Sequence, residues 1–167
     1  RQVTWQNQRA MYTLLFSCVK EVLTTFTKND KKLRGKPGLM MVLHTHSREL
    51  AFHPHIHVVM PAASIDTQTR QWRVKSTKYL FDHEALAIVF KAVLLKTMGT
   101  HELPLPRQYP KKWVVDCKFV GKGKKAIIYL GKYLYKGVIQ EKDILKNENG
   151  KVTFRFINTK TKVYQTK

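Results

Sequence analysis

Acidic residues are scarce in this chain. Its 167 residues hold 11 aspartates and glutamates against 31 lysines and arginines, so the formal net charge is +20. The basic residues are spread along the sequence and do not form one tail. An acidic polymer is the natural partner of such a protein, and nucleic acid is the leading candidate. A basic structural protein of the ribosomal kind is the alternative that charge alone leaves open.

Cysteine is also rare, because the chain has only Cys18 and Cys117, which lie far apart and form no Cys-x-x-Cys pair. These two thiols exclude a zinc ribbon and a disulfide framework, so a reducing, cytoplasmic compartment is expected. No apolar run is long enough to span a membrane and no signal peptide is visible, so we expect no membrane partner.

The length of the chain predicts a single domain over residues 1–167, since this is enough for one well-buried core and too little for two. The sequence opens Arg-Gln-Val without an initiator methionine. We therefore expect it to be one domain of a longer protein.

The pattern of apolar and turn-forming residues predicts an α+β domain with a largely antiparallel sheet. Asp82 is placed to cap a helix that Gly99 would stop, and the polar residues 62–72 are expected to form a loop. The expected elements are a helix over 9–28, strands over 39–45 and 52–60, a helix over 82–98, a strand over 113–120, a helix over 126–136, a turn over 147–150 and strands over 152–157 and 162–165.

Histidines are concentrated in one stretch, where five of the seven lie within fourteen residues: His44, His46, His53, His55 and His57. Side chains at i and i+2 of a strand point to the same face, so His55 and His57 project together as a pair of nitrogen ligands for a divalent metal. If residues 39–60 form a hairpin, the preceding strand adds a third imidazole. Parity does not choose between His44 and His46, because both lie on one face of their strand.

A metal with three histidine ligands keeps open positions for water or a phosphate oxygen. The alternative is a set of solvated histidines at a sheet edge, which is the commoner role of any single histidine. The density of histidines in this stretch favours the metal.

Two tyrosines four residues apart form a second group. Tyr129 and Tyr133 share one face of the helix expected over 126–136. The lysines around them are Lys122, Lys124, Lys125, Lys132 and Lys136. A cationic setting favours the phenolate and binds phosphate, and a tyrosine hydroxyl is a competent nucleophile. An aromatic pair that packs on the sheet is the alternative. Together with the histidines, the pair predicts metal-assisted attack on a DNA phosphate, which yields a 5′-phosphotyrosine and a free 3′-OH.

These motifs together resemble the HUH endonuclease superfamily, and most closely its Y2 transposases of the IS91 kind. The family's metal-strand block is similar to the segment LHTHSRELAFHPHIHVVMP, and its paired-tyrosine helix is similar to YLGKYLYKGVI. The segments KYLFDHEALAIVFKAVLL and VTFRF resemble its intervening helix and the strand after the tyrosines. The resemblance extends over most of the chain, from about residue 9 onward.

The resemblance implies the HUH nuclease fold, a ferredoxin/RRM-like antiparallel sheet with flanking helices. It implies Mg²⁺ or Mn²⁺ held by His55 and His57, with His44 as third ligand, and Tyr129 and Tyr133 as nucleophiles. The implied substrate is single-stranded DNA, at transposon ends or an origin-like sequence, in the bacterial nucleoid. The chain departs from the family at residues 62–63, where Ala-Ala replaces the usual Gly-Gly, and it lacks the family's N-terminal cysteine-rich zinc module.

Other functions remain open at this point. A plasmid or phage replication initiator, or a relaxase, shares the same site chemistry. A non-catalytic nucleic-acid-binding domain would use the charge for phosphate contacts and Trp5, Trp72 or Trp113 for base stacking. A hydrolase that activates water with the histidines alone is a further alternative, and the shortage of carboxylate bases near them argues against it.

Overall fold

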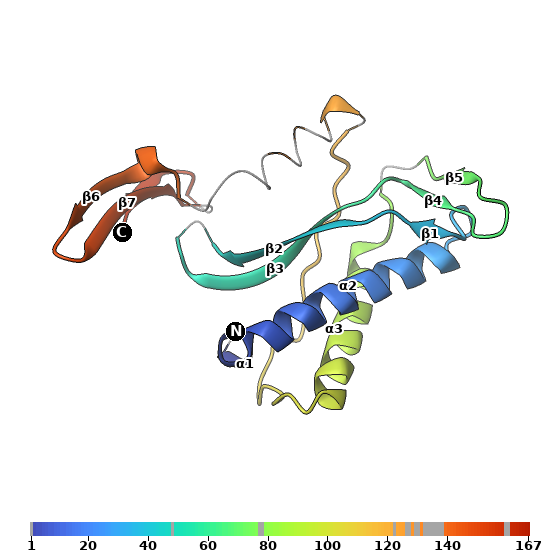
Figure 1. Ribbon diagram of the computed structural model, residues 1–167, viewed down its shortest axis with the longest axis horizontal. Coiled ribbons are helices and arrows are strands. Elements are labelled where there is room, and N and C mark those ends of the chain that lie inside the picture. The colour runs from blue at the N-terminus through green and yellow to red at the C-terminus, as the bar shows by residue number, and fades with distance from the viewer. Residues whose placement is uncertain are drawn as a thin grey trace. The chain divides into compact units, whose positions relative to one another are not determined.

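The computed structural model describes residues 2–47, 49–76, 79–121, 123–125, 128, 131, 139–158 and 161–167. Its helices and antiparallel strands confirm the predicted α+β class (Figure 1). The chain forms two compact units, one of Arg1–Met41 and Ile56–Val120, the other of Val42–His55 and Gly121–Lys167. No helix in the described ranges is both long and apolar enough to cross a membrane.

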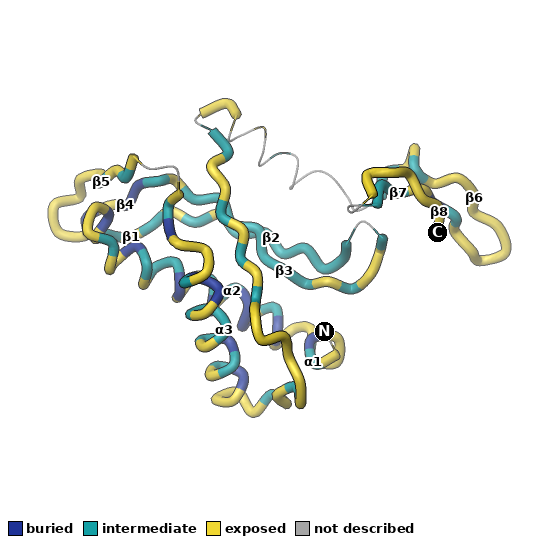
Figure 2. Tube along the Cα trace, turned by 180° about the vertical axis from the view of Figure 1, so that it is seen from behind, coloured by how far each residue is buried: buried dark blue, intermediate teal, exposed yellow. Residues whose placement is uncertain are grey.

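Helices α1 (Gln2–Gln6), α2 (Gln8–Asn29) and α3 (His83–Thr100) form the frame of the first unit. Helices α2 and α3 pack together, and buried residues recur along both (Figure 2). The central buried cluster consists of Val22, Leu33, Phe81 and Leu86. The predicted helix over 9–28 is confirmed by α2, whose buried residues from Met11 to Val22 follow helical spacing and form one apolar stripe.

Helix α3 begins where the sequence predicts. The Asp82 side chain accepts a hydrogen bond of 2.7 Å from the Ala85 N–H, which satisfies one of the unpaired donors of the first turn. The helix does not stop at Gly99 but runs to Thr100, so the predicted end is wrong. Glycine is tolerated inside an exposed last turn, and it acts as a stop only where the chain needs a left-handed residue.

Two strands of a three-stranded antiparallel sheet lie at the ends of the segment 62–72, which we expected to be a loop. Its strands lie in the order β1 (Lys36–Pro37), β4 (Ala63–Ile65) and β5 (Trp72–Val74). The Asp66 carboxylate accepts hydrogen bonds from the backbone N–H groups of Gln68 and Thr69, which folds the connection from β4 to β5 into a tight turn. The loop prediction for residues 62–72 is therefore wrong at both ends.

A long hairpin is formed by β2 (Met40–His46) and β3 (Phe52–Val59), which confirms the two strands predicted over 39–45 and 52–60. Close to its tip, the Ser47 N–H donates to the Ala51 carbonyl at 2.9 Å. The hairpin contributes residues to both units, with Val42–His55 in the second unit and its remaining residues in the first.

The second unit contains η1 (Glu141–Asp143) and an antiparallel sheet of β6 (Ile144–Glu148), β7 (Lys151–Ile157) and β8 (Tyr164–Thr166). Asn149 and Gly150 join β6 to β7 with φ of 51° and 73°, which confirms the predicted turn over 147–150. The sequence also predicts β7 and β8, but it gives no signal for β6.

Residues 113–120 form no strand, so the strand predicted there is wrong. Their burial alternates, with Trp113 and Val115 half-buried and Val114 exposed, and this produces the strand-like pattern in the sequence. The alternation comes from packing on α3, where Trp113 meets Phe90 with 5.9 Å between ring centroids. The helix predicted over 126–136 falls mostly outside the described residues.

A pair of glycines tests this fold. A Cβ added to Gly35 would lie 2.5 Å from the backbone oxygen of Ile65, so Gly35→Ala must push β1 away from β4. We expect it to lower the free energy of unfolding by about 1–3 kcal/mol. A Cβ on Gly99 meets nothing within 4 Å, so Gly99→Ala is the matched control and should stabilise α3 by about 0.5 kcal/mol. Urea titration followed by tryptophan fluorescence measures both, and equal effects of the two variants would contradict the packing at Gly35.

Asp66 predicts how the first unit responds to acid. Hydrogen bonds from the Thr69 and Gln68 backbone and from the Arg73 guanidinium lower the pKa of Asp66 from 3.8 to about 2. A carboxyl with a lowered folded pKa stabilises the protein fully above its ordinary pKa, and this contribution disappears as the pH falls from about 4 to 2. The urea midpoint of the wild type should fall over this interval, and the fall should be smaller in Asp66→Asn. Asp116→Asn, at an exposed carboxyl of the same unit, is the control, and it should retain the full acid response.

Candidate metal centre

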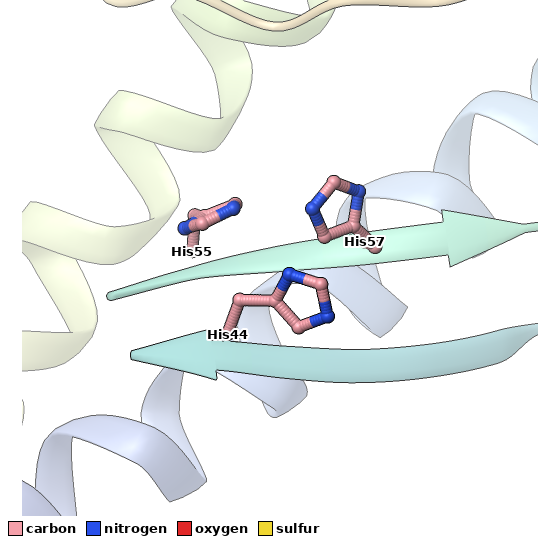
Figure 3. Close-up of side chains that lie close together, drawn as sticks. All are labelled: His44, His55 and His57. Atoms are coloured by element: carbon pink, nitrogen blue, oxygen red, sulfur yellow. The ribbon is translucent and has the colours of Figure 1, made fainter. Parts of the chain in front are cut away.

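Three imidazoles lie together on the β2–β3 hairpin. His44 stands on β2, and His55 and His57 stand on β3, which runs in the opposite direction (Figure 3). One ring nitrogen from each lies within 4.8 Å of the others, and all three residues are half-buried. Among the described residues, they are the group of side chains that can hold a metal ion.

The geometry of paired strands explains this grouping. His55 and His57 are two residues apart on one strand, so their side chains share a face. A neighbouring strand lies about 5 Å away, within reach of an imidazole. The His44 and His55 rings lie almost perpendicular, at 84°, with 5.4 Å between centroids.

The structure separates His44 from His46, a choice that strand parity leaves open. The His46 ring lies against Phe52, with 5.7 Å between centroids, and its Nδ1 is 2.9 Å from the Thr45 hydroxyl. His46 is therefore engaged near the tip of the hairpin and is not part of the cluster.

His53 has a role that the sequence does not reveal. Its backbone carbonyl lies 2.6 Å from Nδ1 of His55. A carbonyl only accepts, so Nδ1 of His55 must carry the proton and donate it. In the neutral ring this leaves the lone pair on Nε2, the atom that can then bind a metal. The spacing of two residues along a strand is the only sequence signal for this support.

The donor set fits a divalent transition metal. Nitrogens bound to one metal at roughly 2.1 Å lie about 3.4 Å apart in a tetrahedral arrangement, so modest rotations of the three rings would bring them into range. Imidazole is a better ligand for transition metals than for Mg²⁺, which prefers oxygen. Of the two metals that the sequence suggests, the three nitrogens favour Mn²⁺.

Of the other predicted site residues, the structure describes Lys124 and Lys125. Tyr129, Tyr133, Lys122, Lys132 and Lys136 lie outside the described residues. Lys124 and Lys125 are described and are exposed to solvent, as a phosphate contact requires.

Comparison with known proteins identifies the family. A family model described as "Putative transposase" matches residues 38–167, which include the whole β2–β3 hairpin. The chain belongs to this transposase family. The resemblance to Y2 transposases of the IS91 kind is thereby confirmed.

Two curated relatives agree with this transposase assignment. The chain is 25% identical over 176 residues to "Putative transposase y4qJ" of Sinorhizobium fredii, covering 92% of this chain and 44% of that protein. It is also 25% identical over 152 residues to "Transposase for insertion sequence element IS801" of Pseudomonas savastanoi pv. phaseolicola, covering 80% of this chain and 37% of that protein. The chain thus spans less than half the length of either relative. No solved structure matches it.

Metal titration of single-histidine variants tests the cluster. We expect His44→Ala, His55→Ala and His57→Ala each to weaken Mn²⁺ binding by at least about tenfold, since each removes one of three ligands. His46→Ala is the matched control from the same hairpin and should bind Mn²⁺ like the wild type. Affinity should also fall in acid, because a protonated imidazole is no ligand. Isothermal titration calorimetry measures these effects, and a His46→Ala loss equal to that of His44→Ala would rule out the cluster.

Proposed function

We propose that the protein is a metal-dependent enzyme that nicks and joins single-stranded DNA, acting in rolling-circle transposition with tyrosine nucleophiles. The observation that carries this proposal is the His44, His55 and His57 cluster on a hairpin inside the residues that match a transposase family. Transposase membership favours this activity over that of a replication initiator or relaxase. The cluster favours it over a non-catalytic DNA-binding domain.

The three histidines are proposed as metal ligands. A divalent cation bound there supplies Lewis-acid polarisation of the scissile phosphate and offsets the charge that develops on it. The His53 carbonyl holds His55 in the tautomer with the proton on Nδ1, so Nε2 would be the atom that binds a metal, without a prior proton loss. The half-buried setting of the cluster keeps the rings partly shielded from water, which strengthens their interaction with charge.

Tyr129 and Tyr133 are proposed as the nucleophiles. The phenolic hydroxyl of one gives up its proton and its oxygen attacks the phosphorus. The bond from phosphorus to the 3′-oxygen breaks, and that oxygen takes up a proton and leaves as a 3′-OH. The product is a 5′-phosphotyrosine, which keeps the energy of the broken ester for rejoining. A second tyrosine allows a second transfer before the first end is released.

The lysines near the tyrosines are proposed to bind the DNA backbone. They are Lys122, Lys124, Lys125, Lys132 and Lys136. Phosphate contacts of this kind supply affinity that is independent of sequence and falls steeply with salt. The chain is proposed to act as a single catalytic domain within a protein of the length of its relatives, with transposon ends as substrate.

Covalent adduct formation tests this mechanism. Incubation with labelled single-stranded DNA and Mn²⁺ should give a protein–DNA adduct on a denaturing gel. Combining Tyr129→Phe with Tyr133→Phe should abolish the adduct, because no phenolic nucleophile remains. Combining His55→Ala with His57→Ala should reduce it by about 100-fold or more, the usual cost of losing electrostatic stabilisation in the transition state.

Tyr164→Phe is the matched control. Tyr164 is 62% exposed and its ring lies beside Arg155, a contact that phenylalanine keeps. This variant should form the adduct at the wild-type rate. An adduct that survives in the double-phenylalanine variant would end the tyrosine assignment.

A further inference from the structure

The three tryptophans differ sharply in their surroundings. Trp113 is half-buried against Phe90, and its indole nitrogen is fully covered. Trp5 is 57% exposed on the five-residue helix α1. Trp72 is 65% exposed at the start of β5, an edge strand of the three-stranded sheet. Of the three, Trp72 is therefore the tryptophan whose indole ring is exposed to solvent on a strand.

Trp72 belongs to a row of side chains that crosses three strands. The register pairs Lys36 of β1 with Ile65 of β4, and Ile65 with Trp72 of β5. Directly paired residues project from the same face of a sheet. Val74, two residues beyond Trp72, projects from that face as well and is 68% exposed. We call Lys36, Ile65, Trp72 and Val74 the Trp72 face.

The opposite side of β5 is fixed by ion pairs. Arg73 pairs with Asp66, which is 7% exposed, and the Lys75 ammonium lies 2.5 Å from the Asp30 carboxylate and 2.6 Å from the Leu80 carbonyl. These two cations are neutralised and hold the sheet in place. The Trp72 face thus lies on a rigid support, which reduces the entropy lost when something binds it.

The face is apolar where a solvent-exposed sheet surface would normally be polar. Ile65 is 38% exposed beside the two more exposed residues, and the tube over the turn before β5 is marked as exposed (Figure 2). Neighbouring exposed apolar side chains on a sheet are what a binding surface requires.

Charge identifies the occupant. Lys36 lies within the row, and Arg34 and Arg70 precede Lys36 and Trp72 by two residues; all three are exposed. None of these three cations forms an ion pair with a described residue. A flat aromatic ring with unpaired cations beside it matches a nucleic acid strand, whose bases stack and whose phosphates are anionic. A second copy of a chain with a net charge of +20 would instead be repelled.

We propose that the Trp72 face binds single-stranded DNA, with one base stacked on the Trp72 indole and the neighbouring phosphate contacting Lys36. Unpaired bases are required, because a base inside a duplex has no free ring face. This proposal rests on the proposed function, which supplies DNA as the partner, and it assigns a contact outside the histidine and tyrosine motifs.

Binding in the absence of metal tests the contact separately from catalysis. The anisotropy of a labelled oligothymidylate is measured with the full 167-residue chain in chelator. Trp72→Ala should weaken binding by about tenfold, the usual effect of losing one stacked base, and Trp72→Phe should stay within about twofold. Lys36→Ala should lower the slope of log affinity against log salt by about 0.7, the value for one phosphate on a single strand.

Two variants serve as matched controls. Ile88→Ala removes a similarly exposed apolar group from α3, outside the face, and Trp5→Ala removes an exposed indole elsewhere. Both should bind within about twofold of wild type. If Trp72→Ala fails to fold by circular dichroism, Trp72→Leu replaces it, since leucine keeps the apolar bulk but offers no ring face. Photocrosslinking to oligonucleotide that carries 5-iododeoxyuridine should map to the peptide containing Trp72.

The outcomes separate the two proposals. Unchanged DNA affinity in Trp72→Ala or Trp72→Leu overturns the Trp72 contact, as does a crosslink that maps elsewhere or a wild type that binds no single-stranded DNA. A change in oligomeric state of Trp72→Ala, measured by sedimentation, would assign the face to a second copy and also overturn it. If the wild type forms no covalent adduct but Trp72→Ala still weakens binding, the proposed function fails and the contact stands.

Discussion

The antiparallel pairing of β2 with β3 is the constraint on which the candidate centre depends. The cluster needs both strands, because β3 contributes His55 and His57 and β2 contributes His44. Hydrogen-bonded strands keep a fixed spacing, so backbone pairing defines the distance between imidazoles better than a loop could. The same backbone acts again through the His53 carbonyl, which determines the tautomer of His55. Strand geometry thus sets both the position of the cluster and the tautomer of His55.

The sequence predicted the elements whose signals are periodic. Apolar residues at helical spacing predicted α2, and Asp82 with its cap predicted the start of α3. It did not predict β4 and β5, because strands of three residues are too short for alternation to show and depend on the turn at Asp66. Residues 113–120 alternate between half-buried and exposed because they pack on α3, although they form no strand. An alternating apolar pattern therefore does not distinguish packing on a helix from pairing with another strand.

The same limit applies to the site. Two histidines on one strand are visible from their spacing, but the third depends on how the strands pair and on the contacts of each ring. His44 and His46 are equivalent by parity, and only the packing of His46 on Phe52 separates them. The exposure of Trp72 is likewise invisible in the sequence, since three tryptophans look alike until the fold buries one and supports another on a sheet.

The scarcity of acidic residues affects both the stability of the fold and the binding of an anionic partner. A net charge of +20 makes the compact state repel itself, so the few carboxylates matter most where cations point inward. Asp30 and Asp66 are used in this way, each neutralising a cation that follows Trp72 on β5 or just beyond it. Arg34, Lys36 and Arg70 are exposed cations of the same region that form no ion pair with a described residue. A polyanion that binds there reduces the repulsion between cations that the chain's own acids do not offset. Its binding should therefore also stabilise the folded first unit.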